Sequence, residues 1–259
     1  MQILIHSSKT MRIPANVKSP LDTPVFLDDA KKLLKKYAHL TDEETAKLMA
    51  VSSKKATEVR DIHAAWLKNT DKPVPAVDAF VGDIYSGLQV QAWSDHDREY
   101  AQKHLLILSG LYGALRACDG ISPYRLEMGY KLPDGSSLYA FWDKKIATIL
   151  PTSTHTIVNL SAVEYTKALL PFVDLPVVTP KFLTISPKTG EPTFVTVHTK
   201  IARGAFAGWL IQNRIEDVDQ LKDFTLLNYA YNKKLSTAEQ PVFVCKEFGG
   251  IGLSVRLTS

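Results

Sequence analysis

One short apolar run, Leu105 to Leu108, ends abruptly in a polar, glycine-rich segment that extends to Gly129. An apolar run of this kind is typical of a buried strand, and polar sequence directly after such a strand is where α/β proteins tend to place ligand sites. The segment contains two arginines, two tyrosines and one glutamate, which together would make a poor core. It therefore predicts a site for an anionic ligand, to which we assign Ser109, Tyr112, Arg116, Tyr124 and Arg125.

Two other short apolar runs, Ile3 to Ile5 and Thr156 to Val158, end in the same way. If the three runs form neighbouring parallel strands, their carboxyl ends share one crevice. Small hydroxyl residues at helix starts leave backbone N–H groups free for an anion, although such a serine also commonly caps a helix. The residues after these two runs that we assign to the site are Lys9, Thr10, Asn159, Ser161 and Lys167.

Helical and strand-like segments are interspersed along the chain, with no linker long enough to divide it and no internal repeat. Hydrophobic periodicity and capping boxes predict helices at 26–37, 41–50, 53–67, 94–104, 143–150, 161–170 and 200–215. Apolar runs predict strands at 2–6, 79–85, 105–108, 156–160, 175–182, 193–199 and 241–248. We therefore expect an α+β (mixed α/β) fold: a single compact domain with a mixed sheet, flanking helices and a helical insertion at about residues 26–70.

The amino-acid composition limits the classes of function that this protein can have. The 259 residues are 45% hydrophobic and 22% charged, with a net charge of +4, which fits a globular protein and permits an anionic partner. Two distant cysteines favour a reducing, cytoplasmic environment. The chain has no metal-ligand spacing, no signal-peptide pattern and no apolar run of roughly 18 residues. We accordingly expect no metal, no cofactor, no membrane association and no protein partner.

The helix predicted at 200–215 carries a basic stripe. At 100° per residue, Lys200, Arg203 and Arg214 fall within an arc of about 60°, with Ala207 between them. Such a stripe suits a phosphate backbone or a nucleotide. A solvated basic face, which is the usual meaning of this pattern, is the alternative.

The insertion contains two helices joined by a tight turn at Val51 to Lys54. The lengths suit a helix-hairpin-helix, in which backbone amides of the turn bind a DNA phosphate and Lys54 and Lys55 would assist. The hairpin glycines usual in that motif are absent, so a plain antiparallel helix pair is the alternative.

Three residues are candidates for catalysis. Glu127 and Asp83 lie among glycine, tyrosine and apolar residues, where burial could raise a carboxyl pKa enough for acid–base work. Their alternative role is to pair with Arg116 or Arg125. Lys9 is either a catalytic amine or an anion ligand.

Assembled in order, these motifs resemble the YaaA family of bacterial peroxide-stress proteins. The resemblance covers nearly the whole chain and rests on Ser8 to Thr10, Gly82 to Tyr85, Leu108 to Arg116, Pro123 to Gly129, Asn159 to Ser161, Ala202 to Gly204, and Asn213 with Arg214. It implies a cytosolic protein that is induced by hydrogen peroxide and that limits unincorporated iron and hence oxidative DNA damage. It also implies a mixed α/β fold with a basic cleft, a helix-hairpin-helix and binding of double-stranded DNA.

Two functions follow as hypotheses. The first is a peroxide-response protein that binds double-stranded DNA through basic residues. The second is an enzyme acting on a nucleotide or nucleic-acid base in the same cleft, with Tyr112 and Tyr124 stacking on the base. A nucleotide or small anionic ligand is therefore the alternative partner to DNA.

Overall fold

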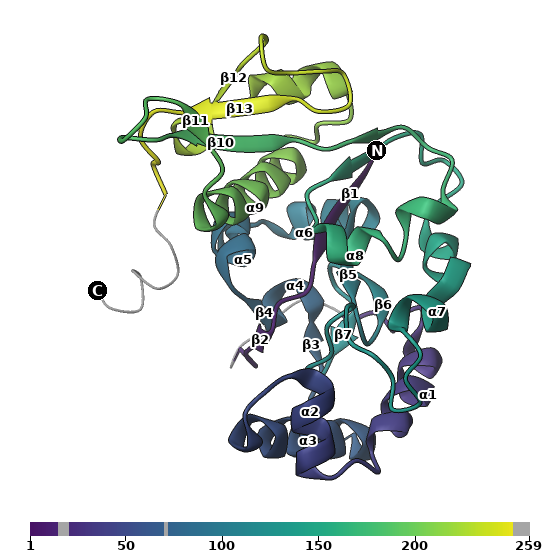
Figure 1. The fold of residues 1–259 in the computed structure, drawn as a ribbon. Helices are drawn as coiled ribbons and strands as arrows, with labels where there is room; N and C mark the ends of the chain where they lie inside the picture. Colours follow the sequence, from purple (N-terminus) through teal and green to yellow (C-terminus); the bar gives the residue numbers. More distant parts are fainter. Residues whose placement is uncertain (15–20, 70–71, 251–259) are drawn as a thin grey trace.

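The computed structural model describes residues 1–14, 21–69 and 72–250 and has a mixed α/β architecture (Figure 1). Its main sheet has five strands in the order β6-β5-β1-β8-β9. Strands β5, β1, β8 and β9 are parallel, and β6 is antiparallel to β5. Their bounds are β1 (Gln2–His6), β5 (Leu105–Ser109), β6 (Gly113–Arg116), β8 (Ile157–Asn159) and β9 (Val177–Val178).

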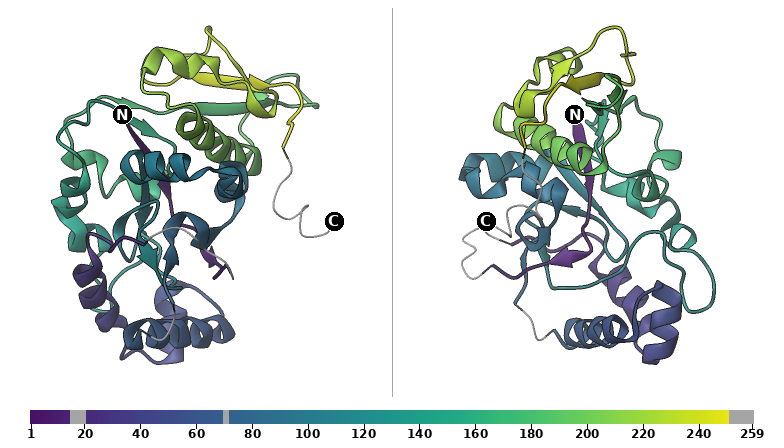
Figure 2. Two further views of the ribbon diagram at one scale, coloured as in Figure 1. Left: turned by 180° about the vertical axis from the view of Figure 1, so that it is seen from behind. Right: turned by 60° about the vertical axis from the view of Figure 1, so that its left-hand side comes forward.

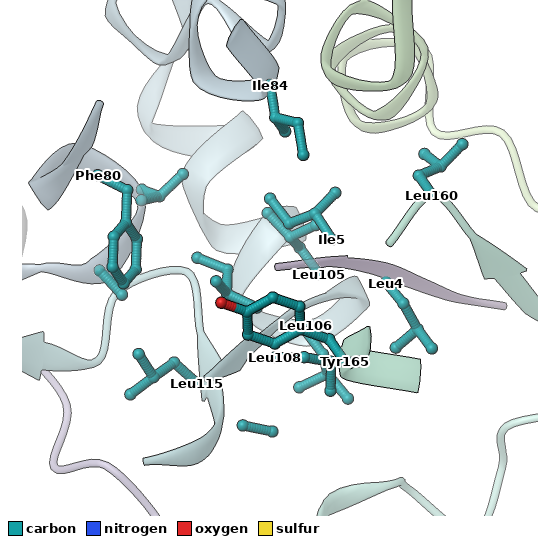
Figure 3. Close-up of a cluster of buried hydrophobic side chains, with 14 of the residues drawn as sticks. Leu4, Ile5, Phe80, Ile84, Leu105, Leu106, Leu108, Leu115, Leu160 and Tyr165 are labelled. Atoms are coloured by element: carbon teal, nitrogen blue, oxygen red, sulfur yellow. The ribbon is translucent and has the colours of Figure 1, made fainter. Parts of the chain in front are cut away.

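The strands of the main sheet are buried on both faces, which explains their continuous apolar sequence. Leu4, Ile5 and Leu105 are fully buried at the centre of the sheet, with Tyr165 packed against the same cluster (Figure 3). Helix α6 (Asp95–His104) lies on one face, and α7 (Leu138–Trp142) and α8 (Val163–Thr166) lie on the other (Figures 1 and 2). The three runs identified in the sequence are thus parallel neighbours, which was the condition for their carboxyl ends to share one crevice.

A second sheet, in the order β11-β10-β13-β12, lies at one end of the molecule (Figures 1 and 2). Helix α9 (Thr196–Gln212) packs between it and the main sheet. The interface between α9 and the second sheet is filled by Phe182, Phe206 and Phe243, whose ring centroids are 5.4–5.6 Å apart. The strand bounds are β10 (Lys181–Ile185), β11 (Pro192–Thr193), β12 (Ala230–Tyr231) and β13 (Val242–Cys245).

Helix α9 also packs backbone to backbone against α5 (Asp83–Leu88). A Cβ atom on Gly204 would lie 1.8 Å from the carbonyl oxygen of Ile84, and one on Gly87 would lie 2.0 Å from that of Ile201. Only glycine permits this approach at the two positions. The contact fixes α9 over the end of β1.

The predicted insertion forms three helices at the end opposite the second sheet (Figures 1 and 2). They are α1 (Leu27–Tyr37), α2 (Asp42–Met49) and α3 (Ser53–Lys68). Thr41 and Glu44 form the predicted capping box of α2, and Ala50 ends that helix in the left-handed region at φ 50°. Residue 70, the predicted end of the insertion, lies outside the described residues.

Four predicted elements were wrong. The strand at 175–182 is instead two strands, β9 in the main sheet and β10 in the second sheet. The strand at 79–85 is instead the end of α4 (Ala76–Ala79), the short β4 (Phe80–Val81) and the start of α5, because Gly82 at φ 152° breaks the extended chain. The strand at 193–199 ends at Thr193, and α9 begins at Thr196. The helix at 161–170 is reduced to α8 and a 3₁₀ turn, because Ser161 does not cap it and Glu164 instead accepts the N–H of Gly129 at 2.9 Å.

The remaining elements are short. They are β2 (Thr10–Met11), β3 (Val74–Pro75), β7 (Gly120–Ile121) and the 3₁₀ helices Val90–Ala92, Asp143–Ile149, Leu170–Phe172, Val218–Asp223 and Leu226–Asn228. Strand β2 pairs with β4 and so brings the start of α5 beside the end of β1.

Candidate functional site

The carboxyl ends of β1 and β8 lie side by side at a topological switch point. The chain leaves β1 towards β5 on one side and leaves β8 towards β9 on the other, and the crevice where such connections diverge is where open α/β sheets bind ligands. The two ends are joined through His6, whose Nδ1 accepts the backbone N–H of Ala162 at 3.1 Å and lies 3.3 Å from Ser161 Oγ. The switch point is therefore a fixed polar structure.

The imidazole of His6 is neutral at physiological pH. Its burial, together with the charges of Arg203 and Lys200, lowers the pKa of His6 from 6.5 to about 3. Its ring stacks on Tyr165 at a centroid distance of 4.8 Å. Because Nδ1 accepts the N–H of Ala162, the ring proton is on Nε2, which is left as a hydrogen-bond donor.

Arg203 lies in α9 close enough to His6 to affect its titration. Its Nε is buried without a hydrogen-bond partner among the described residues. Burial lowers the pKa of the guanidinium, and no carboxylate in the described part of the chain acts against that shift. One turn earlier, Lys200 is exposed. The basic pair predicted from the sequence thus faces the switch point, with the charge of Arg203 uncompensated.

His6, Arg203 and Lys200 form a first cluster. A second, which we call the Glu127 cluster, consists of Glu127, Lys9, Arg125 and Tyr130. Glu127 is only 12% exposed, and Lys9 Nζ lies 2.9 Å from its Oε2. The hydroxyl of Tyr130 donates to Oε1 at 2.5 Å, and Arg125 Nη2 lies 3.9 Å from the same oxygen. The structure therefore joins Lys9 and Glu127, both predicted as catalytic candidates, and supports the predicted pairing of Glu127 with Arg125.

The two clusters are linked through buried tyrosines. The hydroxyls of Ser7 and Tyr165 lie 3.5 Å apart, and burial, with a smaller contribution from the charge of Glu127, raises the pKa of Tyr165. Ser109 and Tyr124 share a hydrogen bond of 2.6 Å at the end of β5, and burial raises the pKa of Tyr124 to about 12. Ser109 and Tyr124 are thus at the predicted edge, but as buried structural groups.

Tyr112 is not positioned to stack on a ligand. It is 1% exposed, and its oxygen accepts the indole N–H of Trp66 at 2.8 Å. Tyr124 is also buried, at 5% exposure, with its ring edge-on to that of Tyr112. The sequence pattern could not distinguish aromatic rings of the core from rings of a binding surface.

Arg116 and Arg214 lie away from the switch point. The turn after β5 reverses the chain, so Arg116 pairs with Leu106 near the amino end of β5, and its backbone N–H donates to Asp119 at 2.9 Å. Arg214 follows the end of α9 at φ 54° and forms an ion pair with Asp97 at 2.8 Å. The predicted stripe is therefore reduced to Lys200 and Arg203.

Of the other residues predicted at this edge, some form hydrogen bonds within the protein and others are exposed. The amide of Asn159 is occupied by Ser161 N and Thr179 Oγ1, whereas Lys167 is exposed directly after α8. Thr10 is exposed in β2, and Asp83 begins α5 with a partly exposed side chain. Asn159 and Ser161 thus shape the site, and Lys167 and Thr10 border open solvent.

The turn between α2 and α3 carries the remaining predicted cations. Lys54 is exposed, but Lys55 forms an ion pair with Glu58 at 2.6 Å. Helix α3 is tied to the segment that holds the Glu127 cluster, because His63 Nε2 lies 3.1 Å from the carbonyl oxygen of Arg125. Through this contact, α3 packs against the segment that holds the Glu127 cluster.

His6, Tyr165 and Tyr130 belong to these clusters but were not among the residues assigned from the sequence. His6 is the last residue of β1, and Tyr165 lies in α8, shortly after the end of β8. This position at the strand ends was the available indication. Tyr130 lies outside the glycine-rich segment and became visible only through its contact with Glu127.

Comparison with known proteins identifies the family. The family model described as peroxide stress protein YaaA matches residues 1–235. The chain belongs to the peroxide stress protein YaaA family. A UPF0246 protein of Salinispora tropica is 49% identical over 259 residues, covering 99% of this chain and 98% of the relative.

More distant relatives match over most of their length. A UPF0246 protein of Legionella pneumophila (strain Lens) is 36% identical over 94% of this chain and 98% of its own. One of Roseobacter denitrificans is 39% identical over 87% of this chain and 91% of its own. The resemblance inferred from the sequence motifs is therefore confirmed at the level of the family.

Two further findings concern the described part of the chain. None of its helices is long and apolar enough to cross a membrane. Within residues 1–14, 21–69 and 72–250, no group of three or more histidine, cysteine, aspartate or glutamate side chains is arranged to hold a metal ion.

Proposed function

We propose that this member of the family binds double-stranded DNA through the carboxyl edge of its main sheet and the adjoining α2–α3 hairpin. The observation that carries the proposal is the distribution of uncompensated cations. Lys200 and Arg203 at the switch point, Lys167 after α8 and Lys54 at the hairpin form no ion pair with a described carboxylate. By contrast, Arg214 and Lys145 form ion pairs with Asp97 and Asp29.

Cations without a carboxylate partner suit a phosphate backbone, since phosphate contacts supply the sequence-independent part of DNA affinity. In this role the protein would act in the peroxide-stress response and help to limit iron-dependent oxidative damage to DNA. The hairpin would contribute backbone amides of its turn, as in a helix-hairpin-helix.

Fluorescence anisotropy with a duplex bearing 5′-hydroxyl ends tests the proposal. Affinity should fall steeply as salt increases, and Lys200→Gln should reduce the slope of that dependence by about 1. Lys188→Gln is the matched control, because Lys188 is exposed in the turn between β10 and β11. Absence of binding even at low salt would refute DNA binding.

A second candidate function is an enzyme acting on a nucleotide or nucleic-acid base. It is favoured by the Glu127 cluster, where a nearly buried carboxylate contacts both an amine and a phenol. Such an arrangement suits proton transfer more than phosphate binding.

Glu127→Gln separates the two functions. A DNA-binding protein should bind duplex DNA at least as tightly after this change, because Lys9 is released from its carboxylate partner. An enzyme should lose its function while DNA binding is retained. A Glu127→Gln strain that survives peroxide as well as the wild type would count against catalysis.

A further inference from the structure

We infer that the switch point contains a specific subsite for a phosphate monoester dianion, built from Arg203, His6 and Lys200. The inference rests on the proposed function for the nucleic-acid nature of the ligand. The subsite itself rests on the contacts of Arg203 and His6.

The first argument is the uncompensated charge of Arg203. A guanidinium taken out of water normally acquires a carboxylate partner, because an unpaired buried charge is strongly unfavourable. Arg98 illustrates the usual solution, with two hydrogen bonds to Asp78 at 2.7 and 3.0 Å. Arg203 is half-buried and has no such partner among the described residues, and its Nε is closed off from solvent. An anionic ligand would supply the missing partner.

The second argument is the fixed tautomer of His6. The backbone N–H of Ala162 can only donate, so Nδ1 of His6 must accept it. The imidazole therefore presents its Nε2 proton, and the stacked ring of Tyr165 holds its orientation. A neutral donor of fixed direction beside an arginine is suited to a phosphate oxygen.

The third argument is the position of these groups. Arg203 precedes Gly204, which packs against the backbone of Ile84 in α5, and the pairing of β2 with β4 brings the start of α5 beside the end of β1. The subsite thus lies at the point of the sheet where α/β folds bind ligands, and it is preorganised.

The charge of the subsite selects the ligand. Two cations, Arg203 and Lys200, match a phosphate monoester, which carries a charge of about −1.5 to −2 at neutral pH. An internal phosphodiester carries a single charge and has only two unesterified oxygens. We therefore assign a terminal phosphate, which is found on a free mononucleotide or at a phosphorylated DNA end.

Isothermal titration calorimetry with a 5′-mononucleotide and its parent nucleoside tests the subsite. The wild type should bind the mononucleotide at least about 10-fold more tightly than the nucleoside, and Arg203→Gln should remove that difference. Lys188→Gln should leave it intact. Duplexes with 5′-phosphate and 5′-hydroxyl ends then distinguish a DNA end from a free nucleotide as the source of the group.

Thermal unfolding without ligand separates a binding role from a structural one. Removing a half-buried charge that has no carboxylate partner should leave the midpoint of Arg203→Gln unchanged or raised. A lowered midpoint would identify Arg203 as structural and overturn the inference. So would equal mononucleotide affinity in the wild type and in Arg203→Lys, whose ammonium keeps the charge but cannot form the planar two-point contact.

The two proposals fail separately. Wild-type binding of the 5′-hydroxyl duplex without any preference for a mononucleotide over its nucleoside overturns the subsite alone. Mononucleotide binding without duplex binding overturns the proposed function and leaves the subsite standing.

Discussion

The contact between α5 and α9 gives a quantitative prediction for Gly204→Ala. In a helix interior this change by itself should stabilise the protein by about 1 kcal/mol, because alanine has the higher helix propensity. Here the new Cβ would lie 1.8 Å from the carbonyl oxygen of Ile84 and 2.8 Å from Leu88 N. Both are backbone atoms, so no side chain can rotate away.

The steric effect should outweigh the propensity. Restoring van der Waals contact requires the two helices to separate by roughly 1.5 Å. Overpacking of a tightly packed region costs about 1–3 kcal/mol and occasionally more, and a rigid backbone contact belongs at the upper end of that range. We therefore expect Gly204→Ala to lower the free energy of unfolding by about 2 kcal/mol net.

Urea denaturation measures this change. The midpoint should fall while the slope with urea stays constant, since the surface exposed on unfolding is unchanged. Gly208→Ala should be milder, because its Cβ would lie 2.9 Å from the carbonyl oxygen of Leu88. Gly120→Ala, with its nearest neighbours at 3.4 Å, should have little effect. If Gly204→Ala is as stable as the wild type or more so, the argument for a backbone contact is wrong.

Three further predictions concern buried polar groups. Burial lowers the pKa of His63 from 6.5 to about 4. The stability of the wild type should therefore fall as the pH decreases from the first value to the second. In urea titrations, His63→Gln should reduce that loss of stability by up to about 3 kcal/mol. Burial raises the pKa of Asp119 from 3.8 to about 6. Its effect on stability has the opposite sign to that of His63, because stability is lost as the pH rises through this window. Asp119→Asn should therefore be more stable than the wild type at pH 7.5 but not at pH 3.5, and a variant that is less stable at pH 7.5 would contradict this. Tyr112→Phe leaves the indole N–H of Trp66 without its acceptor, so thermal or urea unfolding should show a loss of about 1–3 kcal/mol. Duplex DNA affinity should be unchanged in Tyr112→Phe, and weakened DNA binding would place this ring in the interface after all.

Some features of the site follow from local sequence, and these were predicted. The capping boxes at Thr41 and Ser94 depend on residues three positions apart, so the sequence suffices to place the starts of α2 and α6. The apolar runs that form β1, β5 and β8 are buried on both faces, and such strands are recognisable from composition alone. Their polar carboxyl ends predicted the edge where the two clusters lie.

Other features depend on contacts between distant segments. Ser161 and Glu164 have the spacing of a capping box, yet Ser161 lies beside His6 and Glu164 accepts the N–H of Gly129. Arg116 and Arg125 occur in the same glycine-rich segment, and only the antiparallel turn into β6 sends Arg116 to the opposite end of the sheet. Sequence spacing contains no information about either outcome.

The sequence alone thus determined the family, the fold class and the edge of the sheet that bears the site, because each depends on short-range patterns or on motif order. Tertiary structure decided which charges are compensated. Arg214 and Arg203 belong to one predicted stripe, but Asp97 neutralises the first, and no described carboxylate reaches the second. Compensation depends on what packs against a helix from elsewhere in the chain, and for Arg203 it is this missing partner that indicates a ligand.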